Sequence, residues 1–574
     1  MRKMILVLVM FIMFACTLGQ TPPKPSATGP TSAPTESSAS NALQPAETPV
    51  VESGSTNPAV LQAGPRRPRG IYAELHVELE IAQQEKTKPS ITPAELHTYF
   101  KNLYDGILAN PAVSGLAVGI TWGILNPNPP SSPQPYDWSF IDDAFNSVEA
   151  WNAANPTKIP KTIQVQMSAG FGTPKWVMDQ IPSCDGLFQS PPQTPPSNCG
   201  KATFLGFAEG GGGVLPMPWN AFYKKSFRTF IMAFADRYEP NPAFVSMDIS
   251  GPTAASTEMI EPTDSRTPPQ SQFGGLTANN MWLKLLAFAY PNKPAYQKSD
   301  QAFIDEWNAA TDMFGQIYSN VTLVATTGAG LPNLSNTGFT VPPAFKDDCL
   351  TPLDMDCAAE MTILAHFVDP SVATKDTKAT QESGLNGVAG LNALGVKRRA
   401  QITMQLTQPS AQILGGLQFA TSAAHFSVEE GCTSRFPPDK NKTANNLNPA
   451  TLPITNIPQA CLAPDVTITS LSSYQQFSNV PANDLISPEQ SLYNVLRNYF
   501  DETPAAASFG GTLGAAPMNY LQIYVADFQY ATAHTEVRAQ VIKSDGTSEM
   551  VTAQDLLNQA SQNLLQIAEP NYAP

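Results

Sequence analysis

The sequence is poor in charged residues, and positive charge is the scarcer sign. Only 14% of its 574 residues are charged, and the formal net charge is −15 at pH 7. A net negative charge disfavours nucleic acids and anionic membrane surfaces as partners, because both carry negative charge themselves. The balance is compatible with a neutral ligand or substrate.

Several motifs that define catalytic classes are missing. The chain has no G-x-S-x-G motif, which argues against a serine hydrolase of the nucleophile-elbow type. It also has no CxxC pair and no His–Cys cluster of the kind that binds zinc, and its five histidines are scattered. Nothing in the sequence implies a redox cofactor. We therefore expect an activity that needs neither a cofactor nor a metal.

Residues 1–20 have the pattern of a bacterial export signal. Arg2 and Lys3 precede an apolar run over residues 4–14, which is too short for a typical membrane-spanning helix. Ala15-Cys16 then resembles a lipoprotein cleavage box, in which the cysteine receives a lipid; a secretory signal cut near Gly19 is the alternative. The prediction is an exported protein of the outer cell envelope, anchored only through a lipid on Cys16, or otherwise secreted.

Residues 21–65 are rich in Pro, Ser, Thr, Ala and Gly and hold little apolar mass. Such a segment cannot bury enough surface to fold, so we expect a disordered linker. We predict that the remaining residues, 66–574, form one domain.

The six cysteines that follow Cys16 occur as neighbouring pairs. An even number in an exported chain favours disulfide bonds, with free buried thiols as the alternative. The expected disulfides are Cys184–Cys199, Cys349–Cys357 and Cys432–Cys461.

Short apolar runs alternate with helical segments from residue 70 onward. This alternation is typical of βα units around a parallel sheet, and eight such runs predict a single large α/β fold, a (β/α)8 TIM barrel with long loops after its strands. The expected strands span residues 70–77, 115–122, 162–168, 244–250, 321–327, 400–406, 416–421 and 520–525. The link between the sixth and seventh is too short for a normal helix. The three cysteine pairs follow strands three, five and seven, at the barrel face where active sites are built.

Aromatic motifs follow one another in a recognisable order between residues 115 and 262. Trp122 ends an expected strand, and an Asn-Pro loop leads from it to Tyr-Asp-Trp-Ser. A Thr-Pro-x-Trp turn then contains Trp176, and Pro-Trp-Asn contains Trp219. Arg-Tyr and Asn-Pro come before the next strand. This order resembles the retaining TIM-barrel glycoside hydrolases of the β-galactosidase-like type.

The resemblance implies hydrolysis of a glycosidic bond by two carboxyl groups at the C-terminal rim of the barrel. Trp122, Trp176 and Trp219 would shape the sugar subsites. Glu258 would be the general acid/base, partly buried and with a raised pKa, although the Asn-Glu pair of the family is absent here. A structural acid at a helix start is the alternative for Glu258, and Glu261 and Asp248 are the alternative acids.

The family places its second carboxylate at the end of strand seven. This chain has Gln418 there, which we assign to substrate binding. Glu430, beside Glu429, or Asp527 after strand eight would then act as nucleophile or base. The alternative to an enzyme is a carbohydrate-binding barrel that has lost its catalytic pair.

Overall fold

The computed structural model describes most of residues 66–334 and 520–566, with short gaps, and a few single positions between 359 and 493. The export signal, Cys16 and the linker lie outside the described residues and stay predictions. Within the described part of the chain, no helix is long and apolar enough to cross a membrane.

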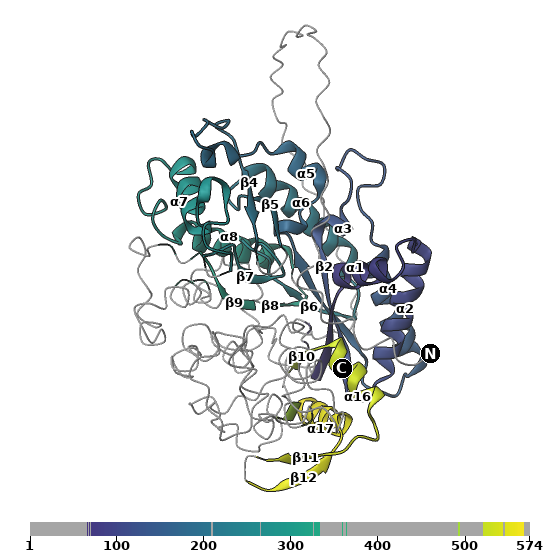
Figure 1. Cartoon of the computed structure of the whole chain (residues 1–574). Coiled ribbons are helices and arrows are strands. Elements are labelled where there is room, and N and C mark those ends of the chain that lie inside the picture. The colour runs from purple at the N-terminus through teal and green to yellow at the C-terminus, as the bar shows by residue number, and fades with distance from the viewer. Residues whose placement is uncertain are drawn as a thin grey trace, which may run out of the picture.

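A six-stranded parallel sheet forms the centre of the structure, in the order β10-β1-β2-β3-β6-β8 (Figure 1). Its strands are β1 (Gly70–His76), β2 (Val113–Thr121), β3 (Thr162–Ser168), β6 (Phe244–Asp248), β8 (Thr322–Val324) and β10 (Tyr520–Tyr524). They coincide with expected strands one to five and eight, and the last strand lies beside the first, as in a barrel. Expected strands six and seven lie outside the described residues. The fold is mixed α/β, with a sheet consistent with part of a barrel.

Helices follow most of the strands and cover the convex face of the sheet. They are α1 (Val77–Thr87), α2 (Pro93–Ala109), α4 (Ser139–Ala154), α6 (Ala221–Tyr238), α7 (Ala278–Ala289), α8 (Gln301–Ile317), α16 (Val525–Ala533) and α17 (Ala553–Gln566). In α6, buried aromatic residues recur every three or four positions, at Tyr223, Phe227, Phe230 and Phe234. This spacing lines one helical face, which explains why the segment packs on the sheet as a helix.

Short elements fill the connections between these units. They are α3 (Trp122–Leu125), η2 (Gly170–Gly172), α5 (Lys175–Gln180), η3 (Asp185–Phe188), β4 (Lys201–Leu205), β5 (Gly212–Pro216), β7 (Glu258–Ile260), η4 (Phe273–Gly275), β9 (Thr326–Gly330), β11 (Ala539–Ile542) and β12 (Ser548–Val551). The Cys184–Cys199 disulfide forms in the connection from β3 to α6, with an S–S distance of 2.13 Å, which confirms that expected pair. The other four cysteines of the expected pairs lie outside the described residues.

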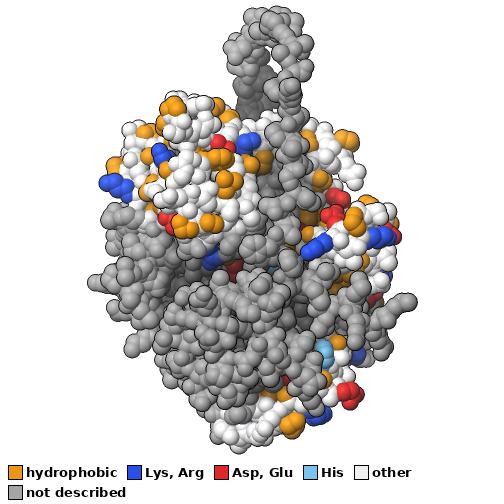
Figure 2. Space-filling model, viewed as in Figure 1, with side chains coloured by type: hydrophobic (Ala, Val, Ile, Leu, Met, Phe, Trp, Pro, Cys, Tyr) orange, Lys and Arg blue, Asp and Glu red, His pale blue; other side chains and the backbone are white. Residues whose placement is uncertain are grey.

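The outer face of the β4–β5 hairpin is partly apolar. Figure 2 shows hydrophobic side chains over the part of the molecule that carries β4, β5 and α7. In the hairpin itself, the side chains of Leu205 and Val214 are exposed.

Side chains on the concave face of the sheet show how strongly it curves. In a flat sheet, strands three positions apart are separated by about 14 Å. Here β1 and β2 lie between β10 and β3, yet Gln522 Nε2 on β10 donates a hydrogen bond to Gln164 Oε1 on β3 at 2.6 Å. Only a sheet that bends around this face brings the two side chains together.

Candidate functional site

A buried network of polar side chains occupies the concave face of the sheet. Gln522 donates to Gln164, and Gln166 Nε2 donates to Gln522 Oε1 at 3.2 Å. Gln164 Nε2 in turn donates to Asp248 Oδ1 at 2.9 Å, and Thr257 Oγ1 donates to Asp248 Oδ2 at 3.1 Å. All five side chains are buried. The network therefore joins β10, β3 and β6 to the segment that leads into β7.

Asp248 sets the direction of donation along this chain of hydrogen bonds. Its two carboxyl oxygens accept the hydrogen bonds of Gln164 and Thr257, so the amide nitrogen of Gln164 must face Asp248. The oxygen of Gln164 is then left to accept from the nitrogen of Gln522, and the oxygen of Gln522 accepts from Gln166. One acceptor at the end of the chain thus fixes the orientation of three amides.

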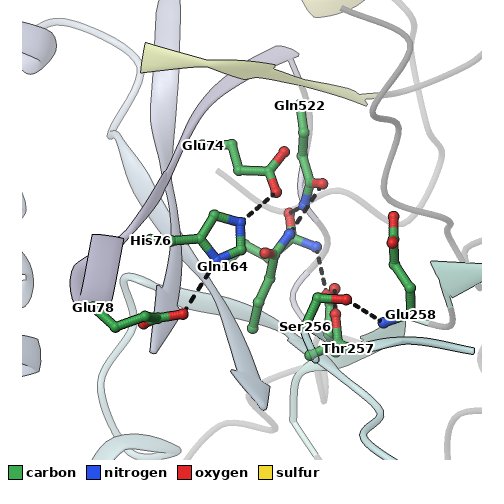
Figure 3. Close-up of polar contacts among 10 residues, drawn as sticks. Glu74, His76, Glu78, Gln164, Ser256, Thr257, Glu258 and Gln522 are labelled. Atoms are coloured by element: carbon green, nitrogen blue, oxygen red, sulfur yellow. Dashed lines mark hydrogen bonds and ion pairs between the residues drawn. The ribbon is translucent and has the colours of Figure 1, made fainter. Parts of the chain in front are cut away.

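A charged cluster lies at the carboxyl end of β1. His76 Nε2 is 3.4 Å from Glu74 Oε1, and His76 Nδ1 is 3.8 Å from Glu78 Oε1 (Figure 3). Burial alone would lower the pKa of His76, but hydrogen bonds to Glu74 and Glu78 and their charges outweigh it and raise this pKa to about 10. His76 is therefore an imidazolium at neutral pH.

Strand β2 has glycines on the concave face, and side chains of the neighbouring strand β1 occupy the space above them. A Cβ on Gly119 would lie 2.3 Å from His76 Nδ1, and a Cβ on Gly115 would lie 2.6 Å from the Tyr72 ring. Because Gly115 lacks a side chain, Tyr72 on β1 reaches across β2, and its hydroxyl lies 2.5 Å from Thr162 Oγ1 on β3. The small residues of β2 thus allow β1 and β3 to meet.

Glu258 stands beside the network, at the first position of β7. It is partly buried, as expected, and its backbone N–H donates to Ser256 Oγ at 3.1 Å. Ser256 has a φ of 56°, a left-handed conformation that turns the chain just before Thr257. The segment then pairs as a parallel strand with β9. The alternative of a helix start at Glu258 is therefore wrong.

Glu261 is a second acid of the same segment, and it is only 1% exposed. Its Oε2 has no hydrogen-bond partner within the described part of the chain. Burial raises the pKa of Glu261 well above the usual carboxyl range. Burial therefore favours the protonated form of Glu261, which is the form that a proton donor needs.

The tryptophans are placed differently from the predicted sugar subsites. Trp122 is 0% exposed and packs between Trp176, Phe227 and Phe230 in the layer between sheet and helices. The prediction that it stacks on a sugar is corrected by this burial, because both faces of the ring are covered. Trp176 and Trp219 are only partly buried at the edge of the core and keep some accessible surface.

The described residues contain one of the two predicted second acids. Asp527 lies in the first turn of α16, just after β10, and is fully buried at the same edge of the sheet. Glu430 and Gln418 lie outside the described residues. Among the residues that the structure describes, no group of three or more His, Cys, Asp or Glu side chains could hold a metal ion.

Comparisons with known proteins add little. No family model matches the chain, and no curated protein matches it. A solved structure that it resembles is a β-galactosidase from Bacillus circulans sp. alkalophilus, at 10% identity and a TM-score of 0.24, over 46% of this chain and 37% of that one. The match thus spans well under half of that enzyme, and a similarity this weak supports no conclusion about function.

Proposed function

We propose that this chain is an exported glycoside hydrolase-like protein with a complete (β/α)8 barrel, which cleaves a glycosidic bond with two carboxyl groups at the C-terminal rim. The strand order of the sheet supports the barrel, since β10 lies beside β1 and the sheet is strongly curved. The observation that carries the function is the buried polar network, which ends beside Glu258 at the carboxyl edge of a parallel sheet. Active sites of barrel enzymes lie at this edge.

In this proposal Glu258 is the general acid/base. It is partly buried, and it follows β6, the strand at whose end the resemblance places the general acid/base. Glu261 is the alternative proton donor, because burial raises its pKa. Asp527 or Glu430 is the nucleophile or base. Trp176, Trp219 and Gln418 contact the sugar.

A panel of glycans and aryl glycosides tests this proposal on the full-length protein. Glu258→Gln keeps the shape of the side chain and removes the proton donor. We expect a large loss of kcat on natural glycans and a smaller loss on aryl glycosides with good leaving groups, which need less protonation. Glu261→Gln is measured in the same way, and Glu85→Gln, on the exposed face of α1, is the matched control.

The outcomes distinguish Glu258 from Glu261 as the general acid, and a hydrolase from a carbohydrate-binding protein. If only Glu261→Gln shows the leaving-group dependence, Glu261 is the acid and Glu258 is not. Equal losses on both substrate types would remove the general-acid role from the residue concerned. Glycan binding without hydrolysis of any substrate by the wild type would instead show a carbohydrate-binding barrel.

A further inference from the structure

Asp248 is a deeply buried acid that contacts the segment carrying Glu258. Its side chain is 0% exposed, and both of its carboxyl oxygens accept hydrogen bonds from neighbouring side chains. One of these hydrogen bonds comes from Thr257, the residue immediately before Glu258.

Thr257 determines how the chain enters β7. The left-handed Ser256 turns the backbone, and the hydroxyl of Thr257 then bonds to Asp248. Thr257 is bonded directly to Glu258, the first residue of β7, so holding Thr257 at Asp248 restricts where the backbone of Glu258 can lie. Figure 3 shows the Glu258 side chain extending away from Thr257.

Gln164 holds Asp248 from the other side. It is itself fully buried, and it receives the hydrogen bond of Gln522 from across two strands. The position of Glu258 is thus linked, through Thr257, Asp248 and Gln164, to the curvature of the sheet.

We infer that Asp248, Gln164 and Thr257 are positioning residues for Glu258: the hydrogen bonds from Gln164 and Thr257 to Asp248 anchor the segment that presents Glu258 at the carboxyl edge. This inference rests on the proposed function for its catalytic consequence. The contacts predict a positional effect on Glu258 whether or not the protein hydrolyses glycans.

The test uses two substitutions that remove a donor and preserve shape, Thr257→Val and Gln164→Met. Thr257→Ser keeps the hydroxyl and is the conservative variant. Thr229→Val is the matched control, because Thr229 lies on the exposed side of α6 and its hydroxyl bonds only within that helix, to Lys225 O. Each full-length protein is assayed for kcat and KM on the best substrate of the panel. The rate at which a water-soluble carbodiimide and glycine ethyl ester modify Glu258 is measured by peptide mass spectrometry.

We expect kcat to fall about 10- to 100-fold in Thr257→Val and Gln164→Met, with KM little changed, because a small displacement of a reacting group is costly. Modification of Glu258 should become several times faster in both. Thr257→Ser should restore most of both properties, and Thr229→Val should match the wild type.

The result that overturns the inference is a folded Thr257→Val protein in which Glu258 is modified at the wild-type rate. If that variant shows no cooperative thermal transition, Gln164→Met decides by the same criterion. If the wild type hydrolyses nothing but the modification rate of Glu258 still changes, the proposed function fails and the positioning of Glu258 stands.

Discussion

Each edge of the sheet holds a largely buried basic side chain, and the pKa values of these two side chains are shifted in opposite directions. At the carboxyl edge, His76 lies between two glutamates, and its pKa is raised to about 10. At the amino edge, Lys161 directly precedes β3 and is 4% exposed. Its Nζ donates to the backbone oxygens of Asn110 and Val113, at 3.1 and 2.6 Å, and lies 4.5 Å from the Trp151 ring centroid. Burial, together with the charge of Lys158, lowers the pKa of Lys161 to about 7.

The difference lies in the partners, since both cations are buried. Carboxylates at the first edge compensate the charge, whereas carbonyl oxygens and an aromatic face at the second edge only solvate it. The predictions below test this difference between the two edges, from the largest expected effect to the smallest.

Asp248→Ala should give the largest loss of stability. It leaves the amide of Gln164 and the hydroxyl of Thr257 buried without their acceptor, which costs about 3 kcal/mol of unfolding free energy. Asp248→Asn keeps one oxygen acceptor and should cost about half as much. Chemical denaturation measures both. A loss below about 0.5 kcal/mol in Asp248→Ala would show that the network does not stabilise the carboxyl edge.

Gly119→Ala tests the space that β2 leaves for His76. The added methyl would lie 2.3 Å from His76 Nδ1, so the imidazole must move away from its glutamates. We expect a loss of about 2 kcal/mol from this overpacking. Gly106→Ala is the control, because nothing lies within 4 Å of a Cβ at that exposed position of α2. Helix propensity should raise stability there by about 0.5–1 kcal/mol. Equal effects of the two substitutions would contradict the steric role of Gly119.

His76 should make stability fall with rising pH. Its pKa is about 10 in the fold and 6.5 when unperturbed, so its contribution is complete below pH 6.5 and is lost as the pH approaches 10. A pKa change from 6.5 to about 10 corresponds to roughly 5 kcal/mol. We expect about 1–2 kcal/mol of this in the measurement, since the contacts of His76 with Glu74 and Glu78, at 3.4 and 3.8 Å, are long. Measured between pH 6.5 and 10, the unfolding free energy of His76→Gln should lack this decline. The same decline in the variant would assign it to another group.

Lys161 should make stability rise with pH over nearly the same interval. Its pKa is about 7 in the fold against 10.5 when unperturbed, so the charged form is disfavoured in the fold, and the penalty disappears as the pH increases from 7 to 10.5. This change in pKa corresponds to roughly 5 kcal/mol. We expect about 1 kcal/mol of it in the measurement, because the carbonyl oxygens and the Trp151 ring stabilise the charged form. Lys161→Met should remove this rise, so that the unfolding free energy of the variant falls with pH as the contribution of His76 is lost. Parallel pH profiles of Lys161→Met and His76→Gln would remove the contrast between the two edges.

Much of the sheet could be predicted because its strands are short apolar runs with clear ends. The strand at 162–168 was predicted with its observed bounds, and the first strand differs by one residue. The alternation of Gln164, Gln166 and Ser168 was the available signal for a polar concave face. The prediction for this run was based on its resemblance to a family and did not include that alternation. The partnership of Gln164 with Gln522 had no such signal, since 358 residues separate them and only the strand order brings them together.

The interpretation of Trp122 was wrong because it relied on residue type and ignored strand phase. Gly119 and Thr121 share the alternation of His76 and Ser168 and face the concave side. Trp122 is the next residue and begins α3, so its ring enters the helix layer, where Asn126 Oδ1 accepts a hydrogen bond from its Nε1 at 3.0 Å. The position of Glu258 could be predicted only in outline, because it depends on the left-handed turn at Ser256 and on the buried contact of Thr257 with Asp248.

The missing side chains of β2 also have a mechanical consequence. The hydrogen bonds between Tyr72 and Thr162 and between Gln522 and Gln164 each connect strands that are not neighbours, across the concave face of the sheet. Flattening the sheet would stretch these bonds, whereas sliding one strand along the next would break the backbone hydrogen bonds between neighbouring strands. The stiffness of this sheet against unrolling therefore resides in a few side chains on its inner surface, and their removal should soften that one mode of deformation while leaving the strand pairing intact.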